Sequence, residues 1–165
     1  MFRPMQRIKQ QLSEEDCIRI LKEEPRGVLS VFGENGYPYG MPLNHLYCEE
    51  DGRLYFHGGM SGHKIDAIRA NDKVSYCVYD SGFRREGDWA LNIKSVIVFG
   101  RAEIVEDPQR ALDVSRALSY KFTDDESYIE KEIQHSGGRV LVFSVSIDYM
   151  SGKLVNEKAL SQNSF

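Results

Sequence analysis

The sequence is short of basic residues and of long apolar runs, and each shortage excludes a class of protein. Its 165 residues carry 21 Lys and Arg against 25 Asp and Glu, a formal net charge of −4. It therefore lacks the basic excess with which nucleic-acid-binding domains attract phosphate. No apolar run approaches the roughly 18 residues of a membrane-spanning helix. We expect neither a nucleic acid nor a membrane as partner.

Export signals and paired cysteines are lacking as well. The N-terminus, Met1-Phe2-Arg3-Pro4, has neither the apolar core nor the cleavage site of a secretory signal. Cys17, Cys48 and Cys77 are odd in number and form no CxxC pair, which is typical of reduced thiols. These features predict a soluble protein of the cytoplasm.

The apolar residues that are present alternate mostly with a period of two, which indicates strands. The length suits one domain over 1–165, with an N-terminal arm at 1–12 and a polar C-terminal tail at 153–165. We predict six strands, of which the first three form an antiparallel meander. The predicted strands cover residues 27–32, 37–48, 53–57, 73–79, 95–105 and 140–145.

Short helices are predicted between these strands, and there is no βαβ alternation. They begin at capping residues near 13, 61 and 107, with a fourth over about 125–135. This organisation is typical of a mainly β (α+β) fold, a closed antiparallel barrel with flanking helices. A small barrel is filled by its own side chains. A cofactor would therefore lie on its outer face, where a second subunit could cover it.

The most informative stretch runs from strand to loop to helix at residues 55–65. Gly58, Gly59 and Gly62 permit close approach to the backbone. The free N–H groups after Ser61 lie at the positive end of a helix, and His63 and Lys64 add cationic side chains there. These features predict a phosphate site. An ordinary capped helix with an exposed His-Lys pair is the alternative.

Two further segments complete the pattern. In residues 37–47, Pro42 cannot donate to a sheet ladder, which predicts an edge or a bulge where backbone groups can meet a ring system. Period two places Pro42 and Asn44 on one face and Met41, Leu43 and His45 on the other. Residues 94–101 form a strong strand with a polar entrance.

Together these segments resemble one family of flavoproteins. The segments read Pro-Tyr-Gly-Met-Pro-Leu-Asn at 38–44, Tyr-Phe-His-Gly-Gly-Met-Ser-Gly-His-Lys at 55–64 and Ser-Val-Ile-Val-Phe-Gly-Arg-Ala at 95–102. They are similar, in the same order, to the nitroimidazole-resistance (Nim-type) proteins of the pyridoxamine 5'-phosphate oxidase-like split-barrel superfamily. The resemblance covers about residues 3–150 and implies an FMN-binding split β-barrel that is a homodimer with FMN at the subunit interface.

The resemblance also implies roles for individual residues. His63 and Lys64 would hold the FMN phosphate, and His57 and Gly58 would contact the cofactor from a strand end. The flavin ring would lie along Met41, Pro42, Leu43 and Asn44. Lys94, Ser95 and Val96 match another cofactor-contacting segment. The chain departs from the true oxidases, because residues 37–44 hold no basic residue and the C-terminus lacks their Trp and Arg segment, so we do not expect vitamin B6 oxidation.

The chemistry implied is electron transfer from NAD(P)H through FMN to a small electron-poor acceptor such as a nitroaromatic. His45 is the candidate catalytic residue, because an imidazole of ordinary pKa near 6.5 can supply a proton at neutral pH. The alternative is a barrel-wall histidine with a structural hydrogen bond. Trp89 is a candidate pocket wall, and residues 82–87 are a candidate lid. The alternatives, which the residues favour, are a core or interface position for Trp89 and an ordinary solvated loop for residues 82–87.

Three other functions are compatible with the sequence. A metal site could combine His45, His57, His63 and Cys48, but their spacing matches no compact ligand motif. A non-catalytic flavin- or haem-binding sensor and a deazaflavin-dependent reductase could use the same barrel. Turnover with NAD(P)H separates an enzyme from a sensor, and the cofactor that is released on denaturation identifies the flavin.

Overall fold

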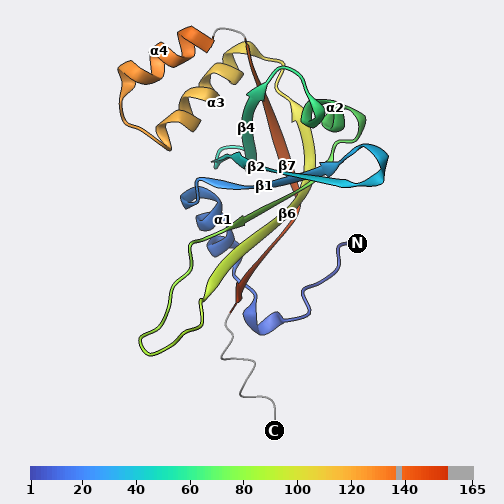
Figure 1. The fold of residues 1–165 in the computed structure, drawn as a ribbon, viewed down its shortest axis with the longest axis vertical. Helices are drawn as coiled ribbons and strands as arrows, with labels where there is room; N and C mark the ends of the chain where they lie inside the picture. Colours follow the sequence, from blue (N-terminus) through green and yellow to red (C-terminus); the bar gives the residue numbers. More distant parts are fainter. Residues whose placement is uncertain (137–138, 156–165) are drawn as a thin grey trace.

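A single curled sheet of seven antiparallel strands forms a half-barrel in the computed structural model, which describes residues 1–136 and 139–155 (Figure 1). The strand order is β2-β1-β5-β6-β7-β4-β3. The strands are β1 Arg26–Phe32, β2 Pro38–Asn44, β3 Leu46–Cys48, β4 Arg53–Gly59, β5 Lys73–Tyr79, β6 Ile93–Ile104 and β7 Val140–Val155. The helices are η1 Ile8–Gln10, α1 Glu14–Glu23, η2 Glu34–Gly36, α2 His63–Ala70, α3 Pro108–Tyr120 and α4 Glu126–Ser136.

The predicted split-barrel fold is confirmed, but there are seven strands where we expected six. The predicted strand 37–48 is divided at His45, whose backbone N–H donates to the Pro25 carbonyl at 3.4 Å. β2 pairs with β1, whereas β3 pairs with β4. Both pairings of the predicted three-stranded meander are thus present, but its middle strand is split into two pieces that lie at opposite edges of the sheet.

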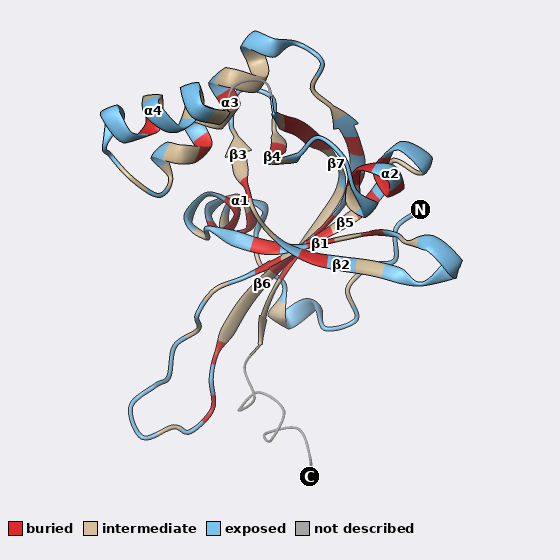
Figure 2. Ribbon diagram, turned by 45° about the horizontal axis from the view of Figure 1, so that its top comes forward, coloured by how far each residue is buried: buried red, intermediate tan, exposed pale blue. Residues whose placement is uncertain are grey.

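Alternation of apolar and polar residues decides which face of each strand enters the core. In β1, Leu29 and Val31 point inward, while Val28 and Phe32 point outward and are exposed. The core is built on aromatic rings, with Phe56 stacked on Phe143 at a centroid distance of 5.0 Å. Full burial of such side chains stabilises the fold by roughly 1.5–3 kcal/mol each. Buried and exposed segments alternate along the sheet (Figure 2), and apolar side chains such as Val28 and Phe32 stay exposed on its outer face.

The helices begin where the capping residues predict, with one exception. Ser13 accepts a hydrogen bond from the Asp16 backbone N–H at 3.1 Å and caps α1, which packs onto the core through Cys17, Ile20 and Leu21. Asp107 caps α3 in the same way. Ser61 does not cap α2. The N-cap is Gly62, which has a φ of 116° and contributes no side-chain hydrogen bond. A non-glycine residue would be strained there.

The last strand is longer than its local pattern indicates. β7 continues to Val155 because it pairs with β6 over most of its length, with a bulge between Phe99 and Gly100. Residues 153–155, predicted as tail, therefore belong to the sheet. The rest of the predicted tail, 156–165, lies outside the described residues, as do residues 137–138. No helix in the described ranges is both long and apolar enough to cross a membrane.

Candidate functional site

The strand–loop–helix segment brings four of the predicted cofactor residues together. β4 ends with His57 and Gly58, and the chain then turns through Gly62 into α2, which starts with His63 and Lys64. The Lys64 side chain folds back over Gly58, so a Cβ at position 58 would lie 2.6 Å from the Lys64 Nζ. The same Nζ lies 5.7 Å from the centroid of the Phe143 ring. A glycine at 58 is therefore required for this placement of the ammonium group.

The positive charge at this place is not neutralised by the protein. Burial lowers the pKa of Lys64 from its ordinary value. Burial also lowers the pKa of His57, and the nearby charge of Lys64 adds to this shift. Across residues 1–136 and 139–155, none of the ion pairs includes Lys64. A half-buried ammonium without a counter-ion is arranged to receive an anion from outside the chain.

The start of α2 adds backbone donors to this charge. The backbone N–H groups of Ile65 and Asp66 already bond to the Gly62 carbonyl, and no side chain caps the helix at Gly62. The donors not used within the helix are therefore the backbone N–H groups of His63 and Lys64. The first N–H groups of a helix have no partner within the helix, and its dipole is positive there. This geometry favours an anion site over the alternative of an ordinary capped helix.

A ring contact joins this helix start to β2. The His63 imidazole stacks on the Tyr39 ring, with centroids 4.2 Å apart and an interplanar angle of 7°. Tyr39 belongs to the strand that also carries Met41, Pro42, Leu43 and Asn44. The contact therefore places the candidate anion site beside the predicted ring-binding strand.

β2 is an edge strand of the sheet, as Pro42 predicts. Pro42 faces outward and is exposed, whereas Met41 is buried in the core. The Leu43 carbonyl lies 2.9 Å from the Tyr76 hydroxyl, and Asn44 Oδ1 accepts a hydrogen bond from Arg26 Nε at 2.7 Å. The parts of this strand open to a ligand are thus its outer face and its backbone edge, and the Met41 side chain is not among them.

The third predicted segment, Lys94 to Val96, does not join this group within one chain. His57 pairs with Val142, whose carbonyl accepts from the Val105 N–H just after β6. Lys94 lies eleven residues before Val105, roughly 35 Å along a strand that rises about 3.3 Å per residue. The Val96 side chain is fully buried. Only the Lys94 and Ser95 end of this segment could meet a ligand, and that ligand would not be the one beside His57 of the same chain.

His45 occupies the core, and this placement argues against its predicted role as proton donor. Its ring is fully buried, with Nε2 2.7 Å from the Leu21 carbonyl and Nδ1 2.9 Å from the Tyr76 hydroxyl. Burial, followed by the charge of Lys121, lowers its pKa from 6.5 to about 4. A neutral ring carries a single N–H, so Nε2 donates to the Leu21 carbonyl and Nδ1 accepts from the Tyr76 hydroxyl. This arrangement favours the alternative interpretation, a structural hydrogen-bonding residue.

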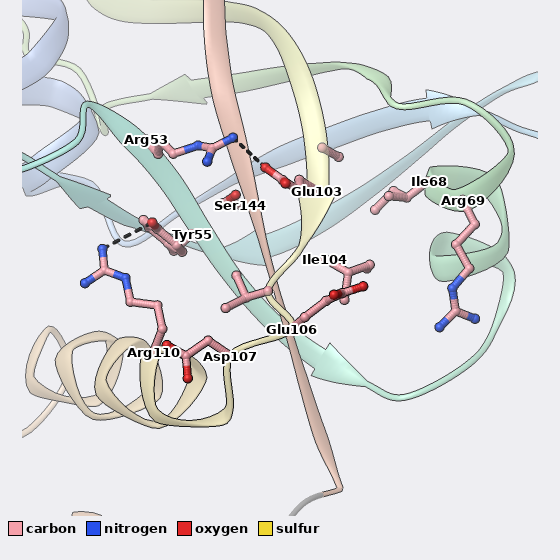
Figure 3. Close-up of a pocket in the computed structure, with 12 residues that line it drawn as sticks. Arg53, Tyr55, Ile68, Arg69, Glu103, Ile104, Glu106, Asp107, Arg110 and Ser144 are labelled. Carbon is pink, nitrogen blue, oxygen red and sulfur yellow. Dashed lines mark hydrogen bonds and ion pairs between the residues drawn. The ribbon is translucent and has the colours of Figure 1, made fainter.

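Away from these residues lies a cavity of about 600 Å³, which contains none of the predicted site residues (Figure 3). It lies between the start of β4, the end of β6 and the start of α3. Arg53 is paired with Glu103 at 2.9 Å and Arg110 with Asp51 at 3.2 Å, so carboxylates of the chain neutralise these two guanidinium groups. Arg53 Nε is buried without a hydrogen-bond partner. These residues are scattered along the sequence, which explains why no motif indicated them.

Metal ligands were the other possibility for the histidines. The described residues contain no group of three or more His, Cys, Asp or Glu side chains placed to hold a metal ion. His63 stacks on Tyr39, while His45 bonds to Leu21 and Tyr76.

Comparisons with known proteins agree with this architecture. The family described as pyridoxamine 5'-phosphate oxidase matches residues 13–154, and no curated protein matches the chain. A candidate 5-nitroimidazole antibiotic resistance protein from Bacteroides thetaiotaomicron is 22% identical, with a TM-score of 0.71 over 87% of this chain and 86% of that one. A FAD-binding protein from Mesorhizobium loti is 27% identical, with a TM-score of 0.63 over 89% and 98%. A flavocytochrome from Azotobacter vinelandii is 22% identical, with a TM-score of 0.71 over 98% and 79%.

Proposed function

Because this chain belongs to the pyridoxamine 5'-phosphate oxidase family, we propose that it binds FMN at the start of α2 and is an oxidoreductase. It would take electrons from NAD(P)H and pass them to a small electron-poor acceptor such as a nitroaromatic. The main support is the Lys64 ammonium, which is half-buried and has no carboxylate partner among the described residues.

The residues at α2 fit the phosphate of this cofactor. Lys64 offers a charge-assisted hydrogen bond, and the uncapped N–H groups at the start of the helix offer neutral ones. His63, held flat against Tyr39, lies at the same helix start. Because Gly58 has no Cβ, the Lys64 Nζ can occupy the space above it. A phosphate bound there would complete the partners that the ammonium lacks.

The edge of β2 fits the rest of the cofactor. Pro42 and Asn44 face outward, and the strand has a free backbone edge. When bound, the flavin would supply the hydride and electron transfer that no side chain can provide. The protein's part is to orient the ring and to exclude water from it. His45 has no part in the proposal, because its two nitrogens are engaged within the core.

The proposal also includes a homodimer. Exposed apolar side chains project from the outer face of β1 and β6, which lie on either side of β5: Val28, Phe32, Ile97 and Phe99. A groove of about 840 Å³, lined largely by apolar groups, runs over the same face. Exposed apolar surface of this extent is typical of an interaction site. A second copy on this face could bring its Lys94 and Ser95 to the first copy's flavin, which the same chain cannot do.

The relatives support a flavin but leave its identity to experiment. One similar structure is described as FAD-binding and another as a flavocytochrome. Purified protein should be yellow, with an absorption band near that of free flavin, and mass spectrometry of the released cofactor should give FMN. If mass spectrometry instead identifies FAD, haem or a deazaflavin, the proposal that the cofactor is FMN is wrong.

The oxidoreductase activity needs a separate experiment. The flavin-loaded protein should oxidise NAD(P)H when nitroaromatics or quinones are supplied, and the rate should depend on bound flavin. Bound flavin without turnover for any reductant would favour the sensor alternative. A protein that neither carries nor accepts FMN would overturn the proposal as a whole.

A further inference from the structure

The loop between β5 and β6, residues 80–92, extends away from the rest of the molecule (Figure 1). It is anchored at its base, because Asp80 Oδ1 accepts hydrogen bonds from the backbone N–H groups of Gly82 at 3.1 Å and Lys94 at 2.9 Å. Phe83 and Asn92 form an isolated antiparallel bridge, and the Asn92 side chain donates to the Phe83 carbonyl at 3.2 Å. The base of the loop is thus an ordered extension of the sheet.

Large apolar side chains on this loop are left in solvent. Trp89 is 81% exposed, Phe83 44% and Leu91 36%. Leu91 lies in the same alternating register as Ile97 and Phe99 of β6, which also point outward. Leu91 therefore continues the apolar outer face proposed to contact a second copy, and Trp89 follows two residues further out. This continuity argues for a second copy as the occupant of the loop's apolar surface.

We infer that the loop of one protomer covers the flavin site of the other, where Trp89 forms a wall that selects flat aromatic acceptors. The inference rests on the proposed function. The loop cannot serve its own chain's site, because its base at Lys94 lies roughly 35 Å along β6 from the level of His57. Each half of the loop, about six residues long, can span about 20 Å, which is enough to extend over a neighbouring subunit. An electron-rich indole face suits an electron-poor ring.

The sequence provides a direct probe, because Trp89 is the only tryptophan in the chain. FMN added to the flavin-free protein should remove most of the Trp89 emission, since a flavin in contact with an indole quenches it. Flavin that binds without changing this emission would overturn the inference while leaving the proposed function intact. Absence of flavin binding would overturn both, and it is recognised by the missing flavin absorption.

A mixed dimer tests whether the contact crosses the interface. One protomer carries Lys64→Ala and keeps Trp89, while the other carries Trp89→Phe and keeps Lys64. The two are co-expressed with different tags, and the mixed species is purified and loaded with one FMN per dimer. Quenching of the single Trp89 is expected, because this residue would face the intact site of the other protomer. Unquenched emission with one bound FMN would show that the loop does not cross.

Acceptor specificity supplies a third readout. Trp89→Ala should raise the KM for a nitroaromatic about 3- to 10-fold, the range expected for one lost aromatic stack, and Trp89→Phe should restore most of it. Tyr128→Ala is the matched control, because Tyr128 is a similarly exposed aromatic residue on α4. Equal KM values for wild type and Trp89→Ala would contradict the selecting role.

Discussion

Two places in this chain put a histidine beside a lysine, and they are built in opposite ways. In the core, both His45 nitrogens have hydrogen-bond partners. The neighbouring Lys121 Nζ bonds to the carbonyls of Glu24 at 2.6 Å, His45 at 3.1 Å and Leu21 at 3.4 Å. At the start of α2, Lys64 lies beside His57 without a carboxylate partner in the described ranges.

The two places differ in whether the polar groups find their partners within the chain, and this difference indicates whether a histidine or lysine serves the fold or a ligand. A polar group whose bonds are all made within the chain stabilises the fold and has nothing left for a ligand. A half-buried charge without a partner lowers the stability of the fold, and a bound ligand of opposite charge offsets this cost. Substitutions should therefore divide cleanly, with changes at His45 and Lys121 affecting stability and changes at Lys64 and Tyr39 affecting cofactor affinity.

The largest expected effect is a loss of stability on acidification that originates at His45. Its pKa is lowered from 6.5 to about 4, so the unfolded chain binds this proton more tightly than the folded protein. The free energy of unfolding is highest above pH 6.5 and falls as the pH drops toward 4, by up to about 3 kcal/mol from this group. Urea titrations at pH 7 and pH 4 measure it. His45→Gln should lose less on acidification, and an unchanged loss would assign the effect to other groups.

The next effect concerns cofactor affinity. Lys64→Met should raise the dissociation constant for FMN roughly 10- to 100-fold, because a hydrogen bond to a charged group contributes about 1.5–3 kcal/mol. The stability of the flavin-free protein should not fall. Fluorescence titration of FMN measures the first, and urea titration the second. Lys9→Met, on the exposed η1, is the control. Equal affinity in Lys64→Met and wild type would remove Lys64 from the site.

Lys121→Met should give the opposite result and so sharpen the comparison. The substitution leaves buried carbonyls without their donor and should lower the free energy of unfolding by about 1.5 kcal/mol, while the apolar stem remains packed. FMN affinity should stay unchanged. Because the charge of Lys121 contributes to the lowered pKa of His45, that pKa should rise in the variant, as measured by NMR titration. A loss of FMN affinity would break the division between the two places.

The smallest expected effect tests the ring contact at the start of α2. Tyr39→Leu removes the stack that holds the His63 imidazole, and FMN affinity should fall roughly 3- to 10-fold. Tyr39→Phe keeps the ring and should bind FMN like the wild type. If both variants bind equally well, the orientation of His63 has no part in holding the phosphate.

Local patterns were sufficient for the parts of the molecule that fold from neighbouring residues. The site around Gly58, Gly62 and Lys64 lies within one strand–loop–helix segment, so its spacing in the sequence already places it in space. Only its capping residue was misassigned, because a glycine with positive φ begins the helix and Ser61 remains exposed. Ser13 and Asp107 cap their helices as their positions indicate.

Features that depend on distant residues were beyond such patterns. The His45 ring is held by hydrogen bonds to Leu21 and Tyr76, which are 24 and 31 residues away in the sequence. Burial lowers its pKa, so the ordinary pKa of histidine did not predict its protonation state. The length of β7 depends on β6, and residues of five elements line the cavity beside Arg53 and Arg110. Nothing local in the sequence encodes these pairings.

The sequence by itself determined the mainly β split-barrel architecture, the strand–loop–helix segment and its positive charge, because alternation, glycine and helix polarity act between residues close in the chain. Only the tertiary structure decided which histidine is buried, which lysine is left unpaired and which apolar strip faces solvent. Burial and charge pairing depend on groups brought together from far along the chain, and one residue type can therefore serve the core in one place and a ligand in another.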